Sequence, residues 1–153
     1  MLPSERSAQI GALYQEIILD HYRKPRNKGE LADADASVPM KNPLCGDEIT
    51  LHVRFGGDSI DDVRFSGRGC SISQASASMM TQLVKGKPLD EIDVLRSRFR
   101  DMVMGDAAAA GDSSLGSLRA LSGVAKFPAR VKCALLAWNA LGTALERRRG
   151  AEG

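Results

Sequence analysis

Two alternating segments joined by a glycine turn constrain the fold of this chain more than any other feature. In the segment EITLHVRF, residues 48–55, apolar and polar side chains alternate, as in a strand with one buried and one wet face. The turn Gly56–Asp58 follows, and residues 60–67 alternate in the same way. The pattern predicts an antiparallel hairpin, and Val38 and Met40 are candidates for a preceding edge strand.

Helical periodicity dominates the rest of the chain. One helix is predicted before the hairpin and four after it, over residues 7–22, 72–85, 89–103, a short segment from Leu115 to Leu121, and about 129–148. The segment GDAAAAGDSS, residues 105–114, is predicted to be a flexible patch. Strands followed by helices predict a single α+β domain over residues 1–153, a small antiparallel sheet with helices packed on one face.

Composition excludes several classes of protein. The 153 residues include 21 basic and 19 acidic side chains, a net charge of +2 that is too balanced for a nucleic-acid binder. No apolar run is long enough for a membrane span, and the N-terminus lacks the apolar core of a signal peptide. We therefore expect a cytoplasmic protein with reduced thiols and no membrane partner, and a monomer is the favoured oligomeric state.

Three cysteines lie at the ends of predicted elements. Cys45 precedes the first strand, Cys70 stands between the second strand and a helix, and Cys133 is placed in the first turn of the last helix. An odd number of cysteines in a reducing compartment argues against a disulfide framework. The start of a helix favours negative charge, so Cys70 and Cys133 are candidates for reactive or metal-binding thiolates.

Asp47 is the fourth candidate, because Gly46 allows the side chains of Cys45 and Asp47 to point at one centre. Three thiolates and one carboxylate are enough for a tetrahedral metal site, whose negative charge Arg130 and Lys132 would partly offset. Each cysteine taken singly could instead be a small buried apolar residue, and Asp47 could be a turn former. The residues alone therefore leave a metal centre and a reactive-thiol centre both open.

Several motifs together resemble the IscU/NifU-type iron–sulfur cluster assembly scaffold family. They are CGD before a strand, GRGCSISQASASMM at a strand–helix junction, VKC in the last helix, YQEIILDHYRKPRN at 14–27 and LVKGKPLDEI at 83–92. The resemblance covers nearly the whole chain. It implies the family fold and a metal site made of Cys45, Asp47, Cys70 and Cys133.

Three departures from the cluster-building members are similar to the SufU branch of the family. Lys132 stands where those members have a histidine, FPARVK at 127–132 replaces their chaperone motif, and the stretch 105–124 is longer. This resemblance implies a zinc-dependent sulfur acceptor rather than a stand-alone enzyme. Its partners would be a PLP-dependent cysteine desulfurase of SufS type and other SUF assembly proteins.

Within that hypothesis Cys45 is the candidate sulfur acceptor, because a loop residue can leave a metal and reach a partner. Arg130 is a supporting residue, since it matches the arginine of the branch's arginine-any-lysine-cysteine motif. The alternative is a scaffold that assembles and transfers a [2Fe–2S] cluster on the same ligands, to which a protonated Lys132 could not contribute.

A hydrolase with a cysteine–histidine pair is a third hypothesis, and it needs a histidine beside a thiol. His21 is predicted to be a hydrogen-bonded core residue, and His52 is predicted on the exposed face of its strand. Neither position favours the hydrolase.

Overall fold

The computed structural model describes residues 3–43 and 46–152. In chain order its elements are α1 (Pro3–Arg23), β1 (Ala36–Asn42), β2 (Asp47–Gly56), β3 (Ser59–Arg68), α2 (Ser71–Val84), α3 (Leu89–Val103), α4 (Ala107–Ala110), the 3₁₀ helix η1 (Ser113–Lys126) and α5 (Pro128–Glu152). None of the described helices combines the length and apolar character that a membrane-spanning segment requires.

The three strands form one antiparallel sheet in the order β1-β2-β3. Leu51 on the middle strand pairs with Val38 of β1 and Phe65 of β3, and all three side chains are buried on the same face. Gly57, with φ 63°, supplies the left-handed turn between β2 and β3. The predicted hairpin and the predicted edge strand are both confirmed.

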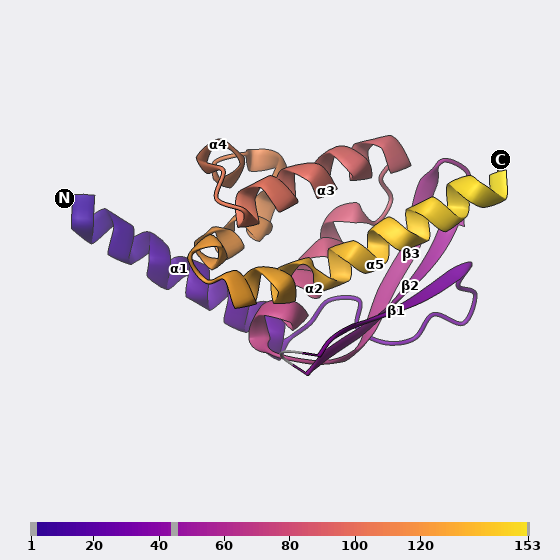
Figure 1. Ribbon diagram of the computed structural model, residues 1–153, viewed down its shortest axis with the longest axis horizontal. Helices are drawn as coiled ribbons and strands as arrows, with labels where there is room; N and C mark the ends of the chain where they lie inside the picture. Colours follow the sequence, from indigo (N-terminus) through magenta and orange to yellow (C-terminus); the bar gives the residue numbers. More distant parts are fainter. Residues whose placement is uncertain (1–2, 44–45, 153) are drawn as a thin grey trace.

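The helices cover one face of this sheet, as the fold-class prediction requires. Helix α5 crosses β1 and β2, and α2 packs beside it against β3, while α1 lies against α2. Figure 1 shows α5 running over the sheet, with α3 and η1 in the layer beyond it. In that layer the Phe99 ring of α3 stacks on Trp138 of α5, with ring centroids 4.8 Å apart.

Helix α2 is the centre of the helical layer and is buried on nearly every side. The sequence predicted a single buried face, but that prediction is too narrow because ten of its residues, Ser73–Thr81 and Val84, are buried. Small side chains along Ala75–Ser78 allow neighbouring helices to approach closely. The buried serines remain satisfied: the hydroxyl of Ser76, for example, donates to the Ala134 carbonyl of α5 at 2.7 Å.

The prediction of a flexible patch at 105–114 is wrong. The segment contains the short helix α4 and the beginning of η1, and each has a capped N-terminus. Asp106 accepts hydrogen bonds from the amides of Ala108 and Ala109 and so caps α4. Asp112 caps η1 through Ser114, and its hydrogen bonds to Ser114 and Arg98 lower the pKa of its carboxyl to about 2. The η1 segment bends at Gly116, where φ is 54°.

Both terminal helices extend beyond their predicted ends. Helix α1 already includes Pro3, and α5 begins at Pro128, a residue that is well suited to the first turn because it needs no donor there. The predicted apolar stripe of α1 is only partly covered, since Leu13 is 53% exposed while Ile17 and Ile18 pack on the core.

His21 joins α1 to α2 by a buried hydrogen bond, as the prediction of a hydrogen-bonded core histidine requires. Its Nδ1 lies 2.8 Å from the Ser78 hydroxyl, and that oxygen also accepts the Arg26 amide at 2.8 Å. Because the hydroxyl oxygen accepts from Arg26, its proton is available to a neutral imidazole. Burial lowers the pKa of His21, Arg26 lowers it further, and Asp20 acts in the opposite direction.

Protonation of His21 is expected to destabilise the fold as the pH falls. The unfolded chain takes up a proton near pH 6.5 and the folded chain only at lower pH, so stability is lost below pH 6.5. The limiting slope is about 1.4 kcal/mol per pH unit. Urea unfolding at pH 7.5 and 5.5 should show a larger loss for the wild type than for His21→Asn. Equal losses in the two proteins would contradict this role.

Candidate metal centre

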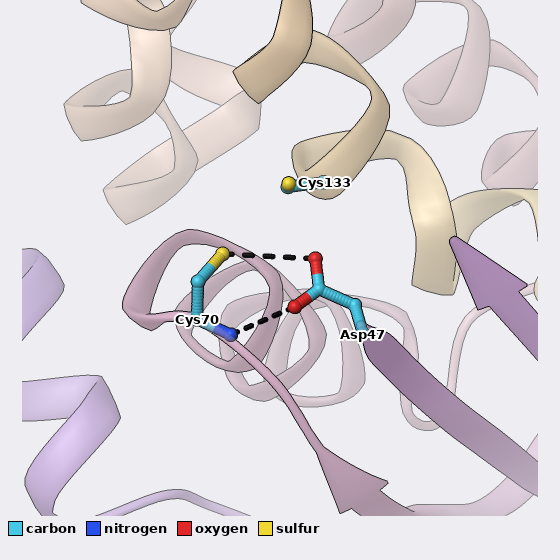
Figure 2. A group of neighbouring side chains, drawn as sticks. All are labelled: Asp47, Cys70 and Cys133. Atoms are coloured by element: carbon cyan, nitrogen blue, oxygen red, sulfur yellow. Dashed lines mark hydrogen bonds between the residues drawn. The ribbon is translucent and has the colours of Figure 1, made fainter. Parts of the chain in front are cut away.

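Asp47 is the first residue of β2, and its side chain is fully buried. One carboxylate oxygen, Oδ1, accepts the backbone amide of Cys70 at 2.8 Å. The other, Oδ2, lies 3.7 Å from the Cys70 sulfur, as Figure 2 shows. The carboxylate therefore joins the start of β2 to the start of α2 and still turns one oxygen towards the thiol.

Gly69 provides the space for this carboxylate. A Cβ at position 69 would lie 2.5 Å from Asp47 Oδ1 and 2.5 Å from the Ser73 hydroxyl, closer than real Cβ contacts. The Ser73 hydroxyl in turn donates to the Cys70 carbonyl at 3.1 Å. A residue without a side chain is therefore required at the approach to Cys70 because the Asp47 carboxylate occupies its place.

Cys70 occupies the N-cap position of α2, with φ −69° and ψ 168°, as the sequence predicted. Its side chain is half-buried, so the sulfur lies at the edge of the core rather than within it. The start of a helix favours negative charge, which suits a thiolate at this position.

Cys133 is buried in α5, but one turn later than predicted. Since α5 begins at Pro128, the cysteine is its sixth residue and lies beyond the first turn. The argument from a helix N-terminus therefore does not hold for Cys133. Its thiol instead contacts the Ala129 carbonyl one turn earlier at 3.6 Å, and its sulfur accepts the side-chain amide of Asn42 at 3.8 Å.

Three of the four predicted ligands converge. Asp47 offers a carboxylate oxygen, and Cys70 and Cys133 each offer a sulfur. These three atoms lie within 4.8 Å of one another and come from β2, the start of α2 and α5. Both cysteines are free thiols. The fourth predicted ligand, Cys45, lies outside the described residues.

The donor set fits a zinc ion. Ligands of tetrahedral zinc with bonds of about 2.0–2.3 Å lie roughly 3.3–3.8 Å apart, so small side-chain movements would close the three atoms on one centre. Cysteine thiolates and a carboxylate are also among the donor types that bind zinc in proteins. Gly46 adopts φ 69° between Cys45 and Asp47, a left-handed conformation that glycine permits.

The two basic residues of the motif are exposed. Arg130 and Lys132 are both solvent-accessible on α5, and Arg130 lines a groove of about 620 Å³ with Ile72 and Phe127. This groove begins next to Cys70, because Ser71 also lines it. Arg130 is therefore accessible from outside the molecule near the thiols.

The histidines do not support the hydrolase hypothesis. His21 bonds Ser78, and His52 bridges the hydroxyls of Ser37 and Ser66 at 2.9 and 3.0 Å on the outer face of the sheet. The group of converging ligands in the described part of the chain contains no imidazole. His52 is half-buried within this row of hydroxyls rather than simply exposed.

Residues 13–145 match the model of the NifU-like N-terminal domain, so the chain belongs to that family. It is 48% identical over 145 residues to the zinc-dependent sulfurtransferase SufU of Bacillus subtilis, covering 94% of this chain and 97% of that one. It is 44% identical over 145 residues to the iron–sulfur cluster assembly scaffold protein IscU of Streptococcus pyogenes, covering 95% and 90% of the two chains.

A similar solved structure is a putative iron–sulfur cluster assembly scaffold protein for the SUF system from Fervidobacterium islandicum. It shares 37% identity with this chain at a TM-score of 0.75, over 85% of this chain and 94% of that one. The predicted family and fold are thereby confirmed.

Gly69→Ala is expected to destabilise the protein by about 1–3 kcal/mol, because the added methyl group would displace the Asp47 carboxylate or Ser73. The free energy of unfolding in urea measures the effect. Gly123→Ala is the matched control, since a Cβ there meets nothing within 4 Å. Equal stability of Gly69→Ala and the control would contradict the close approach at Gly69.

Proposed function

We propose that this protein accepts persulfide sulfur from a cysteine desulfurase of SufS type, at a zinc site formed by Cys45, Asp47, Cys70 and Cys133. The observation that carries the proposal is the convergence of Asp47, Cys70 and Cys133 within 4.8 Å. The similarity to the zinc-dependent sulfurtransferase SufU supports the choice of metal and of reaction.

The protein's residues would hold the metal with three thiolates and one carboxylate. When bound, zinc supplies charge that keeps these thiols deprotonated and shielded. Asp47 is already oriented by the Cys70 amide, which accounts for one of its oxygens and leaves the other available as a ligand. Cys70 and Cys133 are fixed by α2 and α5, whereas Cys45 belongs to the connection between β1 and β2.

Cys45 is the proposed acceptor. Its thiolate attacks the terminal sulfur of the desulfurase persulfide, and a new sulfur–sulfur bond forms on Cys45. The bond between that sulfur and the desulfurase cysteine breaks, and its electron pair remains on the desulfurase cysteine as a thiolate. The proton of the persulfide stays on the transferred sulfur, so no external oxidant or reductant is needed.

Arg130 is proposed to assist the approach of the partner. Its guanidinium is exposed beside the groove that begins at Ser71, and it stands one helical turn before Cys133. A fixed positive charge at that place would stabilise the thiolate charge that passes from Cys45 to the desulfurase cysteine during transfer. Lys132 is exposed on α5, and a protonated lysine has no lone pair to offer a metal.

The purified protein should contain about one zinc ion per chain and be colourless, because a tetrahedral site of this kind holds one ion. Elemental analysis of protein prepared without chelators measures the metal content. Asp47→Ala should lower the zinc content, whereas Asp61→Ala, which removes an exposed carboxylate on β3, should leave it unchanged. Wild-type protein without zinc would contradict the proposed site.

Cys45→Ala should abolish stimulation of a SufS-type desulfurase and should not gain the mass of one sulfur atom after incubation with desulfurase and cysteine. Pro43→Ala, an exposed change two residues away, is the matched control and should behave like the wild type. Desulfurase turnover and intact-protein mass spectrometry are the measurements. A Cys45→Ala variant that stimulates as well as the wild type would refute the acceptor role.

The alternative function is assembly and transfer of a [2Fe–2S] cluster on the same ligands, favoured by the similarity to IscU of Streptococcus pyogenes. Thiolates suit both iron–sulfur clusters and zinc, so the donor set alone does not separate the two functions. Visible charge-transfer absorption of anaerobically purified protein would indicate the cluster. Stoichiometric zinc without colour would support sulfur transfer.

A further inference from the structure

We propose that Asn42 is a positioning residue of the metal centre, which holds the Cys133 sulfur with its side-chain amide and Gly46, the residue before Asp47, with its backbone carbonyl. This inference rests on the proposed function, because it gives Asn42 a role towards the same metal ligands. Asn42 is the last residue of β1 and pairs with Asp47 across the sheet.

The side-chain contact is buried. Asn42 is 6% exposed, and its Nδ2 donates to the Cys133 sulfur at 3.8 Å, a contact between residues 91 positions apart. A buried amide in a protein core requires hydrogen-bonding partners, and a sulfur atom is a weak one unless it carries negative charge. The contact is therefore worth most when Cys133 is a thiolate.

The charge of the proposed site explains why such a donor is needed. Three thiolates and one carboxylate around Zn²⁺ carry a net charge of about −2 by simple counting. The Cys70 amide already donates to Asp47, and Arg130 and Lys132 are exposed. The Asn42 amide is a buried, neutral donor. It stabilises the Cys133 thiolate by a hydrogen bond but does not transfer a proton to it, so the sulfur remains available to the metal.

The backbone of the same residue fixes the other side of the site. The Asn42 carbonyl accepts the Gly46 amide at 2.9 Å, so the end of β1 is joined to the residue directly before Asp47. Asn42 thus connects the buried sulfur of Cys133 to the backbone beside the Asp47 carboxylate.

The test compares Asn42→Leu and Asn42→Asp with Asn139→Leu, which places the same apolar residue at an exposed position of α5. The zinc affinity, measured by competition with a chelator, should be about ten- to one hundred-fold lower in both Asn42 variants, the usual effect of losing a hydrogen bond to a metal ligand. The cobalt-substituted variants should also show a shifted thiolate charge-transfer band, while Asn139→Leu matches the wild type in both measurements.

A second measurement uses the wild type alone, in case the Asn42 variants fail to fold. In protein loaded with cadmium-113, an NMR coupling between the metal and an Asn42 side-chain amide proton should appear through the Cys133 sulfur. The role of Asn42 would be overturned by wild-type zinc affinity and wild-type spectra in folded Asn42 variants. It would also be overturned if this coupling were absent while the Cys133 methylene protons couple to the metal. Wild-type protein that binds none of these metals would overturn the proposed function itself.

Discussion

The hydrogen bond from the Cys70 amide to the Asp47 carboxylate is the interaction on which the site depends. It joins the beginning of β2 to the beginning of α2. The Asp47 carboxylate occupies the space that a side chain at position 69 would need. A fully buried carboxylate is costly unless its oxygens have partners, so this bond and the neighbouring thiol make its burial acceptable. The same carboxylate keeps its second oxygen close to the sulfurs of Cys70 and Cys133.

Cys133, the third candidate ligand, is brought to this point by the packing of α5 against α2. Small residues along α2 let α5 approach closely, and the Ser76 hydroxyl bonds the Ala134 carbonyl, directly after Cys133 in the chain. The geometry of the site is therefore set by the core of the helical layer rather than by the site residues alone. A substitution at Ser76 that kept the side-chain volume but removed this hydrogen bond would therefore alter the position of Cys133.

The elements with strong periodicity were predictable from the sequence. The alternation of residues 48–55 and the apolar face of residues 89–103 correspond to β2 and α3, because burial on one face leaves the same pattern whatever the partner. The importance of Asp47 and Cys70 could also be inferred, since both lie at element ends with glycines beside them. Their convergence with Cys133 follows from helix packing, which no local pattern encodes.

Other features of the structure could not be predicted from local sequence patterns. The segment 105–114 is rich in glycine and alanine, and two aspartate caps turn it into helical starts. Helix α5 begins at Pro128, so Cys133 is its sixth residue and lies beyond the first turn, where the sequence predicted it. Asn42 could not be identified because its partner sulfur is 91 residues distant and reaches it only in the folded chain.

X-ray absorption at the zinc edge of the purified protein tests the proposed ligand set most directly. We predict a four-coordinate shell of three sulfur atoms at about 2.3 Å and one oxygen at about 2.0 Å. A shell of oxygen and nitrogen atoms alone, or one with fewer than two sulfurs, would contradict the central claim that these cysteines and Asp47 bind one metal ion together.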